Sequence, residues 1–184
     1  YDVKDGTDGA NTEYFNAGLN STVLEGAQLS GGSRAVELGL ITHKGTLSLA
    51  RKMLLGALLV TALLLYNSFL ITGEIANAQN ALILGAVGGL LGYFYTARPI
   101  RLVSRRGLGE VAIFLAFGPV LTLGALFAIS SNTIELFSTE FYNAIYLGIP
   151  FGFLTTNILY INQYPDTVSD ASTGKNHLIV TLGK

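Results

Sequence analysis

Cysteine is absent from this 184-residue sequence, and only two histidines occur, His43 and His177. Without cysteine the chain has no disulfide, no thiolate metal site and no cysteine nucleophile. Two histidines leave little room for a histidine-based zinc site. Charged residues make up 12% of the chain, which is about half the share of a typical soluble domain. Thiol chemistry is therefore excluded and zinc chemistry is disfavoured.

The charges that are present nearly balance. The formal net charge is −1, so the chain shows no basic footprint for nucleic acid and we expect no nucleic-acid partner. The first residues are polar and acidic and do not resemble a cleavable signal peptide. Because the chain also lacks an initiator methionine and opens inside an Asp-rich stretch, we expect it to be part of a longer protein.

Half of the residues are hydrophobic, and they gather in four long segments, residues 47–71, 81–95, 111–129 and 144–161. A membrane-spanning helix needs about 20 mostly apolar residues; the first and third segments supply them, and the other two need flanking residues. Backbone in lipid must satisfy its own hydrogen bonds, and no apolar/polar alternation suggests a barrel. The sequence therefore predicts an all-α fold, a polytopic bundle of four transmembrane helices.

The loops between these segments differ in charge. Residues 72–80 and 130–143 contain no lysine or arginine, so all eleven basic residues lie toward the opposite ends of the segments. If four helices alternate across a bilayer, those residues fall on one side, which the positive-inside rule makes cytoplasmic. We therefore expect an integral protein of the cell or inner membrane whose loops 1–46, 96–110 and 162–184 face the cytoplasm.

Glycines and prolines inside the segments predict how the helices pack. Small residues spaced by four let helix backbones approach closely in lipid, although glycine is also simply frequent in membrane helices. Prolines inside helices predict kinks. The glycines are Gly85, Gly88, Gly89, Gly92, Gly148 and Gly152, and the prolines are Pro119 and Pro150.

Polar side chains that could carry chemistry occupy the three loops on the predicted cytoplasmic side. Asn162, Asp166 and Asp170 are spaced by four, so on one continuous helix they would share a face. Pro165 disfavours helical geometry at Tyr164, so we expect the helix to break there and a new turn to start with both aspartates still on one face. The first loop carries Asp2, Asp5 and Asp8, and the middle loop carries Arg98, Arg101, Arg105 and Arg106.

Carboxylates without histidine or cysteine partners suit hard cations. Mg²⁺ typically takes one or two carboxylates, several waters and phosphate oxygens. Two acidic clusters on one side could hold a diphosphate between metal ions, while the arginines and Lys175 bind the remaining oxygens. The alternatives are that the acids belong to solvated loops, that the arginines anchor helix ends to anionic lipid, and that Glu110 favours a helix N-terminus through the helix dipole.

Several motifs together resemble one family. The chain is similar to the UbiA superfamily of membrane prenyltransferases, most closely to its 1,4-dihydroxy-2-naphthoate branch. Pro165 and His177 depart from the usual pattern of that branch. The motifs are Tyr1-Asp-Val-Lys-Asp-Gly-Thr-Asp8, Ser30-Gly-Gly-Ser33, Arg106-Gly-Leu-Gly-Glu110 and Asn162-x-x-x-Asp166-x-x-x-Asp170-x-x-x-Gly174-Lys175.

The resemblance implies a fold of nine transmembrane helices around a central cavity. Residues 1–184 would form part of this single domain: helices three to six, both flanking Asp-rich loops and the start of the next helix. It also implies Mg²⁺-dependent transfer of a polyprenyl group from its diphosphate to an aromatic acceptor, in the formation of a menaquinone-type quinone. A carbocation-like allylic centre would form as the diphosphate leaves, and a naphthoate acceptor would also lose its carboxyl group.

The resemblance assigns roles to particular residues. Tyrosines at the helix ends would shield the cationic centre with their faces, or else only anchor the helices at the interface. The implied metal ligands are Asp2, Asp8, Asp166 and Asp170, and Asp2, Asp166 and Asp170 are the implied catalytic residues. The implied substrate-binding residues are Lys4, Tyr95, Arg98, Arg101, Arg105, Arg106, Tyr160, Asn162 and Lys175.

Other interpretations stay open. A transferase of the same family could use another acceptor: 4-hydroxybenzoate, homogentisate, haem, a chlorophyll precursor or an archaeal glycerol ether. A non-enzymatic membrane scaffold or part of a transporter is a second class. Transporters place charged residues near the bilayer midplane, whereas these segments carry almost none there. The sequence is compatible with a monomer or an oligomer.

Overall fold

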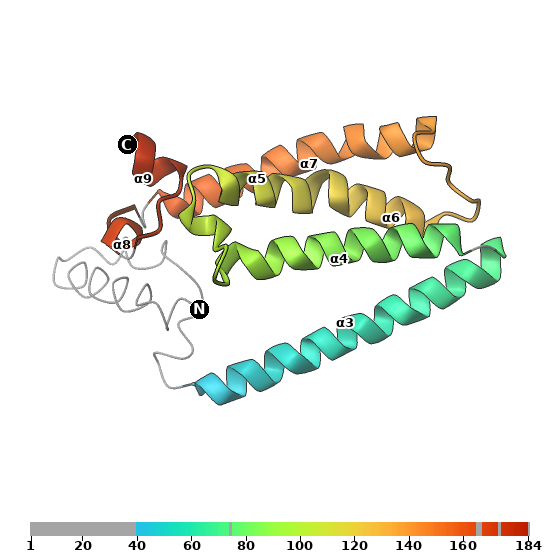
Figure 1. Cartoon of the computed structure of the whole chain (residues 1–184), viewed down its shortest axis with the longest axis horizontal. Helices are drawn as coiled ribbons and strands as arrows, with labels where there is room; N and C mark the ends of the chain where they lie inside the picture. The colour runs from blue at the N-terminus through green and yellow to red at the C-terminus, as the bar shows by residue number, and fades with distance from the viewer. Residues whose placement is uncertain (1–39, 74, 165–166, 173, 184) are drawn as a thin grey trace. The chain divides into compact units, whose positions relative to one another are not determined.

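The computed structural model describes residues 40–73, 75–164, 167–172 and 174–183 of the chain (Figure 1). Every regular element among these residues is helical, which confirms the predicted all-α class. In chain order the elements are α3 (His43–Thr72), α4 (Ala76–Thr96), η2 (Leu102–Ser104), α5 (Leu108–Leu115), η3 (Ala116–Val120), α6 (Leu121–Ile129), α7 (Thr139–Gln163), α8 (Thr167–Ser172) and α9 (Leu178–Leu182).

Three helical stretches in the described part of the chain are long and apolar enough to cross a membrane. They are His43–Ile71, Leu108–Ile129 and Thr139–Gln163. They contain three of the four predicted segments, so those spans are confirmed by length and composition. The fourth, α4, is a helix of 21 residues that is not among these three, and its first turns carry Asn77, Gln79 and Asn80. That α4 also crosses the membrane stays a prediction.

The chain divides into two compact units. The first, called here the helix unit, comprises residues 43–93 and 113–155. The second, called here the loop unit, contains the described residues 40–42, 94–112 and those from 156 onward. All of the predicted site residues that the structure describes fall in the loop unit.

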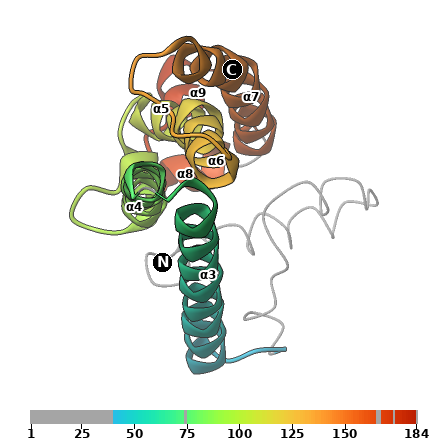
Figure 2. The same ribbon diagram turned by 90° about the vertical axis from the view of Figure 1, so that its right-hand side faces the viewer.

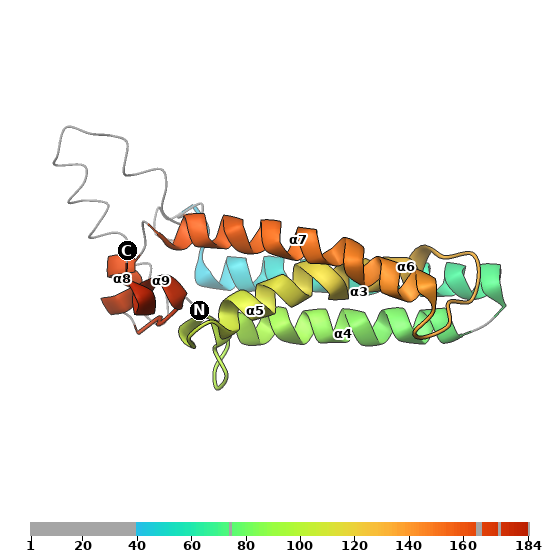
Figure 3. The ribbon, with the colours of Figure 1, turned by 90° about the horizontal axis from the view of Figure 1, so that it is seen from above.

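In the helix unit, α4, α6 and α7 lie side by side (Figures 1 and 3). The end-on view in Figure 2 shows that α3 diverges from α4 toward its N-terminal end. Only 6% of the most apolar stretch of α3 is buried. The buried core of the unit consists of Leu123, Phe127 and Ala144, with partly buried side chains from α4, α6, α7 and the α6–α7 connection packed around it: Ala81, Leu84, Leu126, Ile134, Phe141 and Ile145.

Helix α7 packs closely against neighbouring backbone at Gly148 and Gly152. A Cβ atom at Gly148 would lie 2.6 Å from Thr122 Oγ1 and 2.7 Å from the backbone nitrogen of Pro119. A Cβ atom at Gly152 would lie 2.7 Å from the backbone oxygen of Phe114. Thr122 Oγ1 also donates to the carbonyl of Ala144 at 2.7 Å. The predicted close approach of backbones is confirmed here.

The glycines of α4 behave differently. No atom of the described residues outside the helix's own backbone lies within 4 Å of a Cβ built at Gly85, Gly89 or Gly92. The face of α4 that packs against the core instead carries Ala81 and Leu84. The predicted close approach at these three glycines is therefore not confirmed among the described helices.

The predicted kink at Pro119 is confirmed. Proline lacks a backbone donor and clashes with the preceding turn, so the α-helical hydrogen-bond pattern cannot continue through it. The chain widens into the π-helix η3 there, and Gly118 leaves helical geometry with φ −103° and ψ −112°. Pro150, by contrast, lies inside α7, which continues past it to Gln163.

A buried amide joins α4 to the α6–α7 connection. Asn77 is 1% exposed, and its Nδ2 donates to the carbonyl of Asn132 at 2.8 Å. Its Oδ1 accepts from the backbone amide of Ile134 at 2.9 Å. Both polar ends of the side chain are thus satisfied, as a buried amide requires.

Candidate functional site

The helix that carries the last Asp-rich motif ends where the sequence predicts. Helix α7 stops at Gln163, and α8 begins at Thr167. The hydroxyl of Thr167 donates to the carbonyls of Gln163 at 3.2 Å and Tyr164 at 2.6 Å, which satisfies acceptors that a helix end leaves open. The predicted break near Tyr164 is confirmed, while Pro165 and Asp166 lie outside the described residues.

Asp170 on α8 is a buried carboxylate between two basic side chains. It is 6% exposed, with Oδ1 3.5 Å from Lys175 Nζ and Oδ2 3.2 Å from His177 Nε2. The backbone amide of Lys175 also donates to the Asp170 carbonyl at 2.9 Å. Gly174 has a φ of +74°, a conformation that glycine adopts at no steric cost, and it lies in the turn that brings Lys175 back to Asp170.

His177 contacts both this carboxylate and the start of α9, the short helix that follows α8 (Figure 3). It is 1% exposed, and its Nδ1 accepts a hydrogen bond from the backbone amide of Val180 at 3.4 Å. The tautomer with the proton on Nε2 therefore satisfies both ring nitrogens, because Nε2 then donates to Asp170. No role for His177 was predicted from the sequence; its position just before the apolar run Leu178–Leu182 was the available signal for an N-cap.

Glu110 is buried in the first turn of α5, with 3% of its surface exposed. Its Oε1 accepts from the backbone amide of Leu178 at 3.0 Å, across 68 residues of sequence. Its Oε2 is buried without a hydrogen-bond partner in the described part of the chain. From the sequence, Glu110 was part of the motif Arg106-Gly-Leu-Gly-Glu110 and a candidate for favouring a helix N-terminus through the helix dipole, and no contact with Leu178 was predicted.

Residues 97–107 between α4 and α5, called here the arginine loop, are folded back on themselves. Arg105 Nε donates to the carbonyl of Ile100 at 2.7 Å. Arg101 has a left-handed backbone with φ 45° directly before η2. A Cβ atom at Gly109 would lie 3.1 Å from Val103 Cα, so the lack of a side chain lets α5 begin against η2. The side chains of Arg98, Arg105 and Arg106 are exposed.

The sequence comparison decides the family to which this geometry belongs. The model of the UbiA prenyltransferase family matches residues 43–184, which include the arginine loop and the α8–α9 segment. The chain belongs to the UbiA prenyltransferase family. No solved structure matches it significantly.

Curated relatives in this family include three proteins of modest identity. The UbiA prenyltransferase domain-containing protein 1 of Dictyostelium discoideum is 33% identical over 107 residues, 57% of this chain and 29% of that protein. The chloroplastic 2-carboxy-1,4-naphthoquinone phytyltransferase of Arabidopsis thaliana is 33% identical over 109 residues, 58% of this chain and 28% of that protein. The 2-carboxy-1,4-naphthoquinone phytyltransferase of Synechocystis is 30% identical over 128 residues, 65% of this chain and 39% of that protein. The matches thus span 28–39% of these relatives.

The structure brings some of the residues expected for a UbiA protein together and leaves others apart. Asp170 and Lys175 are in contact, as reported above. Asn162 lies exposed near the end of α7, on a different helix from Asp170, so the two do not share one continuous helix face. Tyr95 and Tyr160 are half-buried near the ends of α4 and α7. Asp2, Lys4, Asp8 and Asp166 lie outside the described residues.

No metal-binding cluster is formed by the described residues alone. None of their histidine, aspartate or glutamate side chains form a group of three or more that could hold an ion. Of the four ligands implied by the resemblance, only Asp170 lies in that part of the chain. Its carboxylate is a suitable hard donor, and so are the other three, because all are aspartates. The donor chemistry of the expected set therefore fits Mg²⁺.

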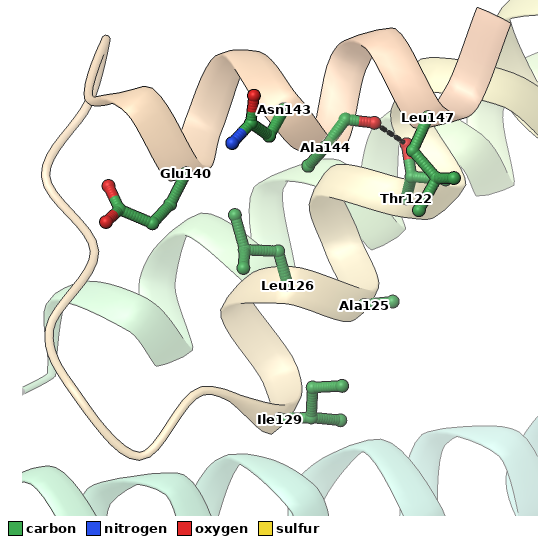
Figure 4. Close-up of a pocket in the computed structure, with 8 residues that line it drawn as sticks. All are labelled: Thr122, Ala125, Leu126, Ile129, Glu140, Asn143, Ala144 and Leu147. Atoms are coloured by element: carbon green, nitrogen blue, oxygen red, sulfur yellow. Dashed lines mark hydrogen bonds between the residues drawn. The ribbon is translucent and has the colours of Figure 1, made fainter.

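A separate groove lies between α6 and α7 in the helix unit (Figure 4). It has a volume of about 440 Å³, and none of the predicted site residues line it. Its walls are largely apolar, with Glu140 and Asn143 near the start of α7. The lining residues are Thr122, Ala125, Leu126, Ile129, Glu140, Asn143, Ala144 and Leu147.

Proposed function

We propose that the protein containing this chain transfers a polyprenyl group from its diphosphate to an aromatic acceptor at a membrane surface. The observation that carries the proposal is the family match over residues 43–184, which covers both the arginine loop and the Asp170–Lys175 segment. A carbon–oxygen bond to the diphosphate breaks, and a carbon–carbon bond to the acceptor ring forms. The diphosphate leaves with the bonding electron pair.

The basic side chains are suited to the leaving diphosphate. Arg98, Arg105 and Arg106 are exposed in the arginine loop, and a guanidinium fork binds phosphate oxygens in pairs. Lys175 adds a positive charge held beside Asp170. Cations placed where negative charge develops lower the activation barrier for cleavage of the carbon–oxygen bond. They do so because they bind the departing diphosphate more tightly than the intact polyprenyl diphosphate.

A divalent cation completes the proposed site. Asp2, Asp8, Asp166 and Asp170 would hold Mg²⁺, and the ion would supply neutralisation of charge on the diphosphate oxygens. Asp170 is itself fixed by His177 and Lys175, so its carboxylate is held in one orientation. Asn162 at the end of α7 would hydrogen-bond a remaining phosphate oxygen.

For the acceptor we propose 1,4-dihydroxy-2-naphthoate, within menaquinone-type quinone formation. Two relatives bear names that specify a carboxylated naphthoquinone and a phytyl group. In this reaction the ring carbon that bears the carboxylate attacks the allylic carbon. The carboxylate leaves as carbon dioxide, and its bonding electrons restore the aromatic ring.

The test uses the native protein that contains this chain, purified and reconstituted in lipid. It is incubated with Mg²⁺, a radiolabelled polyprenyl diphosphate and a panel of aromatic acceptors. Asp166→Asn and Asp170→Asn are compared with the control Glu135→Ala, which removes an exposed carboxylate in the α6–α7 connection. The proposal expects a prenylated, decarboxylated naphthalene product that requires Mg²⁺ and is lost in both aspartate variants only.

Two other results would change the conclusion. Transfer to a different acceptor on the panel would keep the reaction and replace the proposed acceptor. Absence of transfer from the wild-type protein, with no binding of the labelled diphosphate, would favour a membrane scaffold or a transporter component.

A further inference from the structure

Glu110 is a buried acidic side chain that the proposed reaction does not use. It is 3% exposed, and burying a carboxylate is costly unless it is hydrogen-bonded. Its Oε1 accepts a hydrogen bond from the backbone amide of Leu178, and its Oε2 has no hydrogen-bond partner in the described part of the chain. Such a residue needs a physical explanation.

Two observations place this part of the chain beside Leu178. The first is the 3.0 Å hydrogen bond from the Leu178 amide to Glu110. The second involves Gly107, which has a φ of +73°: a Cβ atom built there would lie 3.8 Å from the side chain of Leu178. The backbone amide and the side chain of Leu178 thus both lie beside the end of the arginine loop and the start of α5.

Leu178 belongs to the same short segment as the proposed diphosphate-binding groups. Its neighbour His177 holds the Asp170 carboxylate at 3.2 Å, and Lys175 lies 3.5 Å from the same carboxylate. Moving Leu178 would therefore displace His177 and, through it, Asp170. The Glu110–Leu178 contact fixes where this segment lies relative to the arginine loop.

We propose that Glu110 is a positioning residue that holds the arginine loop and the Asp170–Lys175 segment at the spacing needed to bind one diphosphate. The inference rests on the proposed function. The property that matters is the length of the side chain, because the Glu110 side chain must place an acceptor oxygen within hydrogen-bond distance of the Leu178 amide. Glutamine offers the same reach without the charge, and aspartate keeps the charge but is one methylene shorter.

The test compares Glu110→Gln, Glu110→Asp and Glu110→Ala in the native protein that contains this chain. The alanine variant is expected to raise the KM for the polyprenyl diphosphate about tenfold, as for loss of one hydrogen bond to a charged group, with the acceptor KM nearly unchanged. Glutamine should restore the diphosphate KM and aspartate should not. If aspartate restores it and glutamine does not, the charge is what matters and the positioning role is overturned.

A second readout does not depend on transfer. Hydrogen exchange at the Leu178 amide should quicken about tenfold in Glu110→Ala and Glu110→Asp, but not in Glu110→Gln. The matched control is Asn77→Ala, which removes two hydrogen bonds in the helix unit and should change neither this exchange nor the diphosphate KM. Unchanged exchange in Glu110→Ala would overturn the proposal. Slow exchange in a wild-type protein that shows no transfer would instead count against the proposed function alone.

Discussion

His177 and Asp170 form a buried pair in which the imidazole Nε2 lies 3.2 Å from the carboxylate. The other ring nitrogen accepts from the backbone amide of Val180 and caps α9. The His177 side chain therefore has two roles: it caps α9, and it orients the Asp170 carboxylate of the proposed site.

The substitution His177→Asn should separate helix capping from orientation of the carboxylate. His177→Asn keeps a side-chain oxygen that can cap α9, because asparagine is a preferred N-cap, but it is too short to reach Asp170. His177→Ala loses both contacts and should destabilise the protein by about 1–3 kcal/mol, the cost of unsatisfied buried groups. Thermal unfolding in detergent should rank wild type first, asparagine second and alanine last. Transfer activity should fall equally in both variants, and full activity in His177→Asn would contradict the orienting role.

Substitution of the α7 glycines should disrupt the packing of the helix unit. Gly152→Ala would place a Cβ 2.7 Å from the Phe114 backbone oxygen, and Gly148→Ala would meet the backbone nitrogen of Pro119 at the same distance. We expect each to cost about 1–3 kcal/mol, because backbone cannot yield as a flexible side chain does. Circular dichroism during heating would measure the loss.

The matched control for these variants is Gly89→Ala on α4, where a Cβ meets no described atom outside the helix's own backbone within 4 Å. Alanine is a better helix former than glycine by about 1 kcal/mol, so this variant should be neutral or slightly more stable. Equal destabilisation at all three positions would contradict the observed difference in packing.

Substitution of Arg106 tests whether the arginine loop binds the substrate or anchors helix ends to anionic lipid. It is exposed, so its removal should leave the fold intact. Arg106→Ala should raise the KM for the polyprenyl diphosphate about tenfold through loss of a charge-assisted contact, with a smaller change in Arg106→Lys. Steady-state kinetics in neutral and anionic lipid would measure this. The control Arg51→Ala removes an exposed arginine on α3. A KM that depends on lipid charge but not on Arg106 would favour the anchoring alternative.

The absence of cysteine from this chain makes its orientation measurable. In a cysteine-free background, Ser131→Cys marks the α6–α7 connection and Asn176→Cys marks the stretch between α8 and α9; both positions are exposed. A membrane-impermeant maleimide added to intact cells should label the first directly. The second should be labelled only after the membrane is opened. Labelling of both from outside would show that α7 does not cross the membrane.

Local features of the sequence were sufficient to predict the helices. Apolar runs near 20 residues predicted α3, the α5–α6 stretch and α7, because a helix satisfies its backbone hydrogen bonds within its own segment. Pro119 marked a kink, and Pro165 marked the region where a helix breaks. Each proline lacks the backbone donor that a continuous helix needs. The sequence was less informative about glycine: the same spacing occurs in α4 and α7, yet of these glycines only Gly148 and Gly152 meet a neighbouring backbone among the residues that the structure describes.

For the candidate site, the sequence supplied the residue types but not their partners. The sequence marked Asp170 and Lys175 as charged groups of one motif, and the structure places them in contact. It gave no indication that His177 would hold Asp170, or that Glu110 would reach Leu178 across 68 residues. Such contacts depend on turns at Gly107 and Gly174 and on which helices meet, and neither is encoded in any local pattern.

The sequence by itself therefore determined an all-α membrane scaffold and the charged groups at the ends of its helices. Helix formation and membrane partition depend on composition over a short stretch, so they can be read from neighbouring residues. The tertiary structure alone decided which charges are buried, what each hydrogen-bonds and how Asn77 joins α4 to residues 132 and 134. Those outcomes depend on side chains that are distant in sequence, because burial removes water and leaves each polar atom to find its partner within the fold.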